Sequence, residues 1–445
     1  MNAPTLALAE HLRALLAQGG VFTAQQFQSA TGKSQPSISL ALAKLGPAVC
    51  KLGAARSTRY ALTQPILGLP AEQTLTWTTP EGTQQTFGSL HFLHSGQVYA
   101  RTPQGADWLS PQGQLPWFLQ TLRPQGFLGR QLTRLRPDFP ADPDTWRTEQ
   151  VLYMAINHVG DPPGALHLGQ NLGRFVPEVP STMPADQAQN FDALARAVTQ
   201  TLPAASSAGG EQPKFTTQAM GADGQHQHLI VKFSPPRGTP FGERWHDLLH
   251  LEHLALDVLA DNGVAVASAR IVESDERTYL VSERFDRVGM EGKRHVVAAA
   301  AVHDAFVHAP RQHWVATCEA LVAQKLLAPA HVSTVASTYL FGQYIGNTDM
   351  HFGNLSFFVD DVVQPALVPT PVYDMLPMAW RPGVHGGELD ARPVQAQAQP
   401  GGYGTLAAEA RAWAITYWER AAALPGLSTA LRAASAENAR QFKKM

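Results

Sequence analysis

Three oxygen-bearing side chains in the last quarter of the chain could together hold a divalent cation and accept a proton. Four residues separate Asp349 from Asn354, and Asp374 follows twenty residues after Asn354. A carboxylate can take the proton of an attacking hydroxyl, and amide and carboxylate oxygens are ligands that Mg²⁺ prefers. This set suits transfer of a phosphoryl group, where positioning and charge neutralisation supply most of the catalysis.

A lysine and a glutamate further upstream fit the same chemistry. Lys232 ends the mostly apolar run 228–231, which predicts a buried strand, and Glu252 lies within a predicted helix over 243–262. A buried ammonium needs an anionic partner, either a phosphate or a carboxylate. Protein kinases pair a strand lysine with a helix glutamate, and their catalytic loop has the spacing D-x-x-x-x-N. Taken alone, a strand lysine is more often an edge residue with a solvated tip.

A segment with paired glycines, residues 206–214, precedes the predicted strand. Adjacent glycines let backbone N–H groups approach phosphate oxygens closely. The segment matches neither the P-loop nor the G-x-G-x-x-G pattern, so by itself a surface turn explains it better. The order of glycine segment, lysine, aspartate–asparagine pair and later aspartate favours the nucleotide interpretation.

The charge of the chain is unevenly distributed. The total is −2, yet residues 1–60 carry six basic side chains and one acidic one, so the rest of the chain sums to −7. The total argues against a protein that coats nucleic acid generally, whereas the partition allows one basic module. The two cysteines, Cys50 and Cys318, cannot form a disulfide framework, and there is no signal pattern or apolar run of 18 residues. We expect a cytoplasmic protein without a membrane partner.

The basic N-terminal segment predicts a winged helix-turn-helix. Periodicity and capping residues indicate helices over 6–18, 23–31 and 34–45, the third capped by Ser34, and a β-ribbon over 49–62. Two helices joined by a short glycine-containing turn and followed by a basic ribbon are typical of DNA-binding modules. The side chains placed to meet double-stranded DNA are Lys33, Ser34, Gln35, Ser37, Ser39, Arg56 and Arg59. A protein-interaction module with a solvated basic face is the alternative.

Three histidines recur on one face of the predicted helix over 243–262. His246, His250 and His253 stand at positions i, i+4 and i+7. Two histidines four residues apart can bind zinc. No carboxylate or fourth ligand follows at motif spacing, so the sequence favours a packed or solvated face.

Several of these stretches resemble the HipA family of toxin serine/threonine kinases. The matching segments are 209–214, 231–232, 280–287 and 347–354, and residues 160–166 are similar to a glycine-containing turn of that family's N-terminal subdomain. The similarity covers about residues 65–380. The added N-terminal module is similar to the YjjJ branch, whereas ordinary HipA proteins rely on a separate antitoxin, HipB, to bind DNA.

The resemblance implies an α+β chain with four parts. These are the winged helix-turn-helix (1–64), a mixed β-rich subdomain (65–185), and a two-lobed kinase-like fold with an N-lobe (186–287) and a mostly helical C-lobe (288–445). It also implies an enzyme that uses ATP and Mg²⁺ to phosphorylate a serine or threonine of a protein. The family further suggests a HipB-like antitoxin and a translation-related substrate as partners.

Motif by motif, the resemblance assigns roles to residues. Asp349 would be the catalytic base, His351 would support its loop, and Asn354 and Asp374 would hold Mg²⁺. The residues that would bind ATP, with residues 283–285 as the hinge near adenine, are Ser207, Gly209, Gly210, Lys232, Glu252, Glu283, Arg284 and Phe285. Either Ser206 or Ser207 would be autophosphorylated.

Two other functions compete with this interpretation. One is a DNA-binding regulator whose kinase domain is weak or only senses nucleotide; the intact Lys232, Asp349, Asn354 and Asp374 argue against it. The other is an Mg²⁺-dependent nuclease, which would leave the glycine segment and Lys232 without a role. Gly353, where many family members have lysine, and the alanines at 298–301 are departures that bear on the protein substrate.

Overall fold

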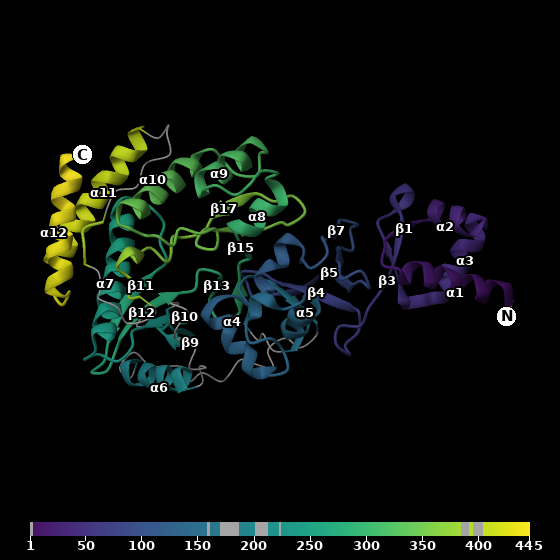
Figure 1. The fold of residues 1–445 in the computed structure, drawn as a ribbon, viewed down its shortest axis with the longest axis horizontal. Helices are drawn as coiled ribbons and strands as arrows, with labels where there is room; N and C mark the ends of the chain where they lie inside the picture. The colour runs from purple at the N-terminus through teal and green to yellow at the C-terminus, as the bar shows by residue number, and fades with distance from the viewer. Residues whose placement is uncertain are drawn as a thin grey trace. The chain divides into compact units, whose positions relative to one another are not determined.

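A computed structural model describes residues 3–157, 161–169, 187–200, 212–221, 224–383, 391–394 and 404–445. The chain divides into two compact units (Figure 1). Unit 1 consists of Met1–Thr79, Thr83–Pro124 and Leu132–Val176, and unit 2 of Pro80–Gly82, Gln125–Gln131 and Pro177–Met445. Ser206, Ser207, Gly209 and Gly210, to which the sequence assigns roles, lie outside the described residues, as does the side chain of Arg56.

Unit 1 begins with three helices, α1 (Ala3–Ala17), α2 (Ala24–Thr31) and α3 (Gln35–Leu45). Strands β1 (Phe22–Thr23), β2 (Val49–Leu52) and β3 (Arg59–Leu62) form an antiparallel sheet in the order β1-β3-β2. Leu12, Phe27 and Leu42 are buried between the helices. The predicted helices and ribbon are therefore present, with a short additional strand, β1.

The ends of two of these helices test the capping predictions. Thr23 caps α2 through a complete capping box with Gln26, which satisfies two backbone donors reciprocally. Ser34 stands at the N-cap of α3 but makes no side-chain cap hydrogen bond. Its hydroxyl lies 3.0 Å from that of Ser37 instead. Ser34 therefore occupies the predicted N-cap position, but the predicted cap hydrogen bond is absent. The Ser34 hydroxyl is paired with the Ser37 hydroxyl, one turn further along, instead.

The rest of unit 1 centres on a five-stranded antiparallel sheet in the order β7-β6-β5-β4-β8. Its strands are β4 (Glu72–Thr78), β5 (Gln84–Phe92), β6 (Val98–Arg101), β7 (Asp107–Leu109) and β8 (Leu166–Leu168). Of the two α-helices described between β7 and β8, α5 (Thr148–Asn157) belongs to unit 1, whereas α4 (Gly126–Leu132) lies almost entirely in unit 2. Gly53 donates its N–H to the Tyr99 hydroxyl at 3.0 Å, which links the N-terminal ribbon to this sheet.

The N-lobe of unit 2 is a four-stranded antiparallel sheet in the order β11-β12-β10-β9, with one helix before β9 and another between β10 and β11. The strands are β9 (Lys214–Met220), β10 (His226–Phe233), β11 (Ala269–Glu273) and β12 (Thr278–Glu283). Helix α6 (Gln187–Gln200) packs Phe191 against Phe215 and Tyr279. Helix α7 (Pro240–Asp261) is capped by the Thr239 hydroxyl. The strand order makes β10 an interior strand of the sheet.

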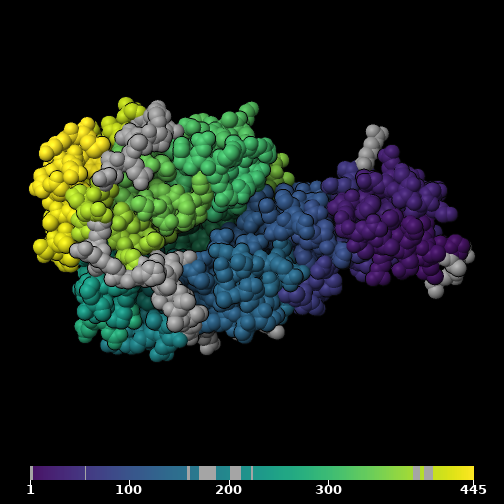
Figure 2. Space-filling view, viewed as in Figure 1, coloured from purple at the N-terminus to yellow at the C-terminus, as the bar shows by residue number. Residues whose placement is uncertain are grey.

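The C-lobe is mostly helical, as predicted, and also contains small sheets that the sequence analysis did not anticipate. Its helices are α8 (Ala299–Phe306), α9 (Trp314–Ala323), α10 (Ala330–Tyr344), α11 (Gly404–Ala423) and α12 (Thr429–Lys444). Strands β13 (Arg287–Val288) and β14 (Gly292–Lys293) form a hairpin, while β15 (Val296–Ala298), β16 (Ser356–Val359) and β17 (Leu367–Pro369) form a sheet in that order. The yellow atoms of α11 and α12 form a continuous block in Figure 2. Among the described helices, none combines the length and apolar composition needed to cross a membrane.

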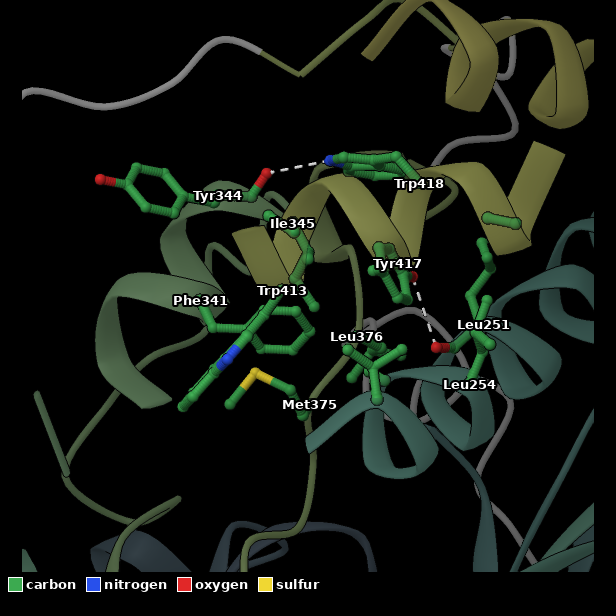
Figure 3. Packing of buried hydrophobic residues seen from close by; sticks show 14 of the residues in the cluster. Leu251, Leu254, Phe341, Tyr344, Ile345, Met375, Leu376, Trp413, Tyr417 and Trp418 are labelled. Atoms are coloured by element: carbon green, nitrogen blue, oxygen red, sulfur yellow. Dashed lines mark hydrogen bonds between the residues drawn. The ribbon is translucent and has the colours of Figure 1, made fainter. Parts of the chain in front are cut away.

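The C-lobe core brings α7, α10 and α11 together (Figure 3). Tyr417 of α11 donates its hydroxyl to the Leu251 carbonyl of α7 at 3.3 Å, and Trp418 donates its indole N–H to the Tyr344 carbonyl of α10 at 3.3 Å. Met375 and Leu376 are buried in the same cluster. The core therefore fixes the residues that flank Glu252, the end of α10 and the segment that follows Asp374.

Candidate functional site

Lys232, Glu252 and Asp374 form one charged cluster. The Lys232 ammonium donates to Glu252 Oε1 at 2.5 Å and also contacts Asp374 Oδ1. Lys232 is 7 % exposed and Glu252 only 2 %, so the lysine's charge is compensated away from water. One ammonium faces two carboxylates, which leaves the three groups with a net negative charge when all are ionised. The strand lysine and helix glutamate meet as the sequence predicts.

The electrostatics of the cluster keep Lys232 and Asp374 charged. Burial opposes the charge on Lys232, but Asp374 and Glu252 outweigh it and raise its pKa. Burial likewise opposes ionisation of Asp374, but the charges of Lys232 and Lys214 lower its pKa to about 2. Since Asp374 is only partly exposed, these nearby charges act with little screening by water.

Lys214 is a second cation at this cluster, and the sequence analysis gave it no role. In the β9–β10 pairing, Lys214 is directly opposite Lys232, so both side chains project from the same face of the sheet. Burial, together with the charge of Lys232, lowers the pKa of Lys214, whereas Asp374 raises it. The only feature of the sequence that pointed to Lys214 was its position at the end of the glycine segment. The register of two paired strands, which places Lys214 opposite Lys232, cannot be read from a single sequence.

The backbone at Asp374 has an uncommon conformation. Its φ is +54°, in the left-handed region that non-glycine residues seldom adopt, although aspartate does so more readily than most. The preceding Val372 is fixed by paired hydrogen bonds, since its N–H donates to Ala265 and its carbonyl accepts from Ala267, both at 2.9 Å. Met375 is buried immediately afterwards (Figure 3). Anchors on both sides thus hold the carboxylate toward Lys232.

The loop after α10 holds Asp349 through hydrogen bonds of its own. Asn347 Oδ1 accepts the Asp349 N–H at 3.0 Å, and Asn354 Nδ2 donates to the Asp349 carbonyl at 2.8 Å. The His351 carbonyl accepts the indole N–H of Trp314 at 3.0 Å. His351 Nε2 lies 3.7 Å from Asp349 Oδ1. The Asp349 carboxylate is about half exposed and can therefore meet an incoming hydroxyl.

Asn347 joins the two halves of the site. Besides accepting from Asp349, it donates Nδ2 to the Asp374 carbonyl at 3.2 Å. One buried amide thus relates the backbone of the Asp349 loop to that of the Asp374 segment. Asn347 begins the segment 347–354 that resembles the HipA family, but the sequence alone did not indicate this positioning role.

The donor set around this junction fits Mg²⁺. Asn354 uses its amide nitrogen on the Asp349 carbonyl, so its amide oxygen is the atom that remains for a cation. The carboxylate of Asp374 supplies further oxygen atoms, the ligand type that Mg²⁺ selects.

The residues of the predicted hinge, 283–285, make both backbone and side-chain contacts. The Glu283 N–H donates to the Ser268 carbonyl at 2.9 Å. The Arg284 guanidinium makes a bidentate pair with Asp286, at 3.0 and 2.9 Å, and both residues are buried. Arg284 therefore has its side chain engaged within the lobe. The Phe285 ring lies 5.6 Å from that of Tyr373, the neighbour of Asp374.

A depression of about 340 Å³ lies on the α10 side of the Asp349 loop. It is lined by Tyr339 and Gln343 of α10 and by residues 347–351. The opening gives a side chain from another molecule a path to the Asp349 carboxylate.

The residues predicted to contact DNA lie in unit 1, far along the chain from the charged cluster of Lys232, Glu252 and Asp374. Lys33, Ser34, Gln35, Ser39 and Arg59 are exposed, and Ser37 is half-buried. The α3 residues Ile38 and Leu42 turn inward to the core. The start of α3 thus exposes polar side chains, as direct contact with base edges or phosphates would need, whereas Leu40 is exposed further along the helix.

Comparisons with known proteins identify the family of the chain. Residues 206–440 match the model of the HipA-like C-terminal domain, and residues 69–176 match that of the YjjJ-like toxin, middle domain. The chain is 35 % identical over 353 residues to Toxin YjjJ of Escherichia coli (strain K12), which covers 77 % of each chain. A structure of the Shewanella oneidensis MR-1 toxin–antitoxin system HipA, HipB and its operator DNA contains a chain that is 17 % identical, with a TM-score of 0.53. That match covers 83 % of this chain and 96 % of the other.

Proposed function

Since the chain belongs to the YjjJ-like branch of the HipA toxin family, we propose that it transfers the γ-phosphate of ATP to a serine or threonine of a protein. The observation that carries this proposal is the contact of Lys232 with both Glu252 and Asp374, which lies 142 residues away. A strand lysine, a helix glutamate and a metal-binding aspartate form this arrangement in protein kinases.

The residues divide the work as follows. Lys232 would hold the phosphates and Glu252 would orient Lys232, while the backbone of 283–285 would face the adenine and Phe285 would pack beside it. Asn354 and Asp374 would hold Mg²⁺, which when bound neutralises charge on the phosphates. Asp349 would accept the proton of the substrate hydroxyl as its oxygen bonds to the γ-phosphorus and the bond to the ADP oxygen breaks. His351, close to Asp349, would keep that loop in place.

The chain should also label itself. Incubation with Mg²⁺ and γ-labelled ATP is expected to place phosphate on the peptide that contains Ser206 and Ser207, the positions matching the family's modified serine. Phosphopeptide mapping of the Ser206→Ala and Ser207→Ala variants should assign the site, and the double variant should lose this label. Label that persists on that peptide in the double variant, or that appears only elsewhere, would contradict the assignment.

We further propose that residues 1–64 form a winged helix-turn-helix that binds double-stranded DNA. Support comes from the exposed polar residues Gln35 and Ser39 of α3 and from exposed Lys33 and Arg59. Cations that meet phosphates release counterions, so binding should weaken steeply with salt. A HipB-like antitoxin remains a proposed partner, suggested by the HipA–HipB–DNA complex noted above.

The Lys33→Ala/Arg59→Ala double variant should weaken binding to all duplexes alike. Its log–log salt slope should fall by about one for each lost phosphate contact, or about two in total. Fluorescence anisotropy with a labelled duplex at several salt concentrations measures both quantities. The control is Lys443→Ala/Lys444→Ala, which removes the same charge from the exposed end of α12. Equal affinities for the two double variants would reject the DNA-binding surface.

A further inference from the structure

Helix α7 and strand β11 bring together two imidazoles and a carboxylate that the proposed kinase chemistry does not use. His246 and His250 stand one turn apart on α7, and Glu273 ends β11. One potential ligand atom from each residue lies within 4.8 Å of the others. Glu252 follows His250 by two residues, about 200° around the helix, so this cluster occupies a different face of α7 from the Lys232 contact.

We propose that His246, His250 and Glu273 bind one Zn²⁺ ion. Tetrahedral Zn²⁺ with bonds of about 2.0–2.1 Å spaces its ligands roughly 3.4 Å apart. Glu273 Oε1 lies 2.9 Å from His250 Nε2 and 3.9 Å from His246 Nδ1. The first distance is shorter and the second longer than the spacing between ligand atoms in a tetrahedral Zn²⁺ site. The ring centroids of the two histidines are 4.6 Å apart. Small side-chain adjustments would therefore suffice to close the site around an ion.

The hydrogen bonds of His246 do not satisfy its ring. His246 is 2 % exposed, its Nδ1 lies 2.5 Å from the Thr278 hydroxyl, and its Nε2 has no partner among the described residues. A buried imidazole nitrogen without a partner is costly. The nitrogen that faces Glu273 is Nδ1, so an ion bound by this cluster would take the place of the Thr278 hydroxyl as the partner of Nδ1.

Glu273 is oriented by groups on both sides. Its Oε1 is directed at the histidines, while its Oε2 lies 3.8 Å from the Arg237 guanidinium. Two imidazole nitrogens and one carboxylate oxygen match Zn²⁺ rather than Mg²⁺. The partly exposed Glu273 leaves room for water as a fourth ligand.

The carboxylate is the ligand that spacing in the sequence could not supply. Glu273 lies 23 residues after His250 and meets it because β11 runs beside α7. Since β11 is an edge strand of the sheet, a bound ion would tie α7 to that edge. Because the ion would bind to the helix that carries Glu252, we expect it to brace that helix. The proposal of Zn²⁺ binding does not depend on kinase activity.

Titration of the metal-free full chain with Zn²⁺, in competition with a chromophoric chelator and with excess Mg²⁺ present, tests the site. Co²⁺ gives a second readout, because tetrahedral coordination by nitrogen and oxygen produces visible absorption bands. The wild type is expected to bind one ion tightly. His250→Ala and Glu273→Gln should each weaken Zn²⁺ binding by about tenfold or more and abolish the Co²⁺ bands.

The matched control is His253→Ala, on the same helix but paired with Asp257 and the Ala269 carbonyl outside the cluster. It should bind Zn²⁺ as the wild type does, and so should Asp349→Asn, which separates this site from the proposed kinase chemistry. Equal Zn²⁺ affinity in wild type, His250→Ala and Glu273→Gln would overturn the proposal, as would Co²⁺ bands that survive both substitutions.

Discussion

Replacing Asp349 with asparagine should reduce phosphate incorporation from labelled ATP by about 10²- to 10⁴-fold, the usual contribution of a general base. Asparagine keeps the size of the side chain, and the hydrogen bonds that hold this residue use its backbone. The loop should therefore keep its shape while losing its proton acceptor. The measurement is a single-turnover incorporation assay with saturating ATP and Mg²⁺.

Two further measurements make this test decisive. Asp360→Asn, an exposed carboxylate directly after β16, removes the same charge and should leave incorporation unchanged. ATP affinity of Asp349→Asn should stay within a few-fold of wild type, because Asp349 does not contact Lys232 in the charged cluster. Tight ATP binding without incorporation by the wild type would favour a nucleotide-sensing regulator. Undiminished incorporation by Asp349→Asn would remove Asp349 from the mechanism.

Replacing Lys232 with methionine should both weaken ATP binding and destabilise the fold. The change leaves Glu252, which is 2 % exposed, and Asp374 without the ammonium they share. Breaking a buried ion pair by removing one partner typically costs about 3–5 kcal/mol of unfolding free energy. Urea denaturation measures this loss, and isothermal calorimetry measures ATP binding.

The Lys232→Met/Glu252→Gln double variant separates the two effects. Removing the unpaired buried charge should restore part of the stability, while ATP binding should stay weak because the phosphate-binding ammonium is still absent. Lys443→Met, an exposed lysine paired with Glu419 on the surface, is the control and should change stability little. A Lys232→Met protein as stable as wild type would contradict the buried pairing.

The same pairing predicts a pH dependence. The folded pKa of Asp374 is about 2, below the ordinary value of 3.8, so its pairing stabilises the fold above about pH 4. That contribution should disappear as the pH falls from about 4 to about 2, where the carboxylate takes up a proton. Lys232→Met should show a shallower loss of stability over this window than the wild type.

Some structural features follow from residues close together in the chain, and these agree best with the sequence. The helices α2 and α3, the ribbon of β2 and β3, and the long helix α7 depend on local patterns. The small sheet of β15, β16 and β17 was missed because β15 and β16 pair across more than fifty residues. Ser34 lost its predicted cap bond to a neighbouring hydroxyl, a choice between two local partners that spacing cannot decide.

The sequence by itself determined the chemical groups, their order and the closed loop at 349–354, whose Asn354–Asp349 hydrogen bond spans five residues. It also indicated the family, which the comparisons confirm. Only the tertiary structure decided which distant groups meet: Lys232 with Asp374, Lys214 opposite Lys232, and Glu273 beside His250. The reason is physical, because strand register and core packing fix those contacts. Both depend on which buried surfaces fit together, and no periodicity in the chain records that fit.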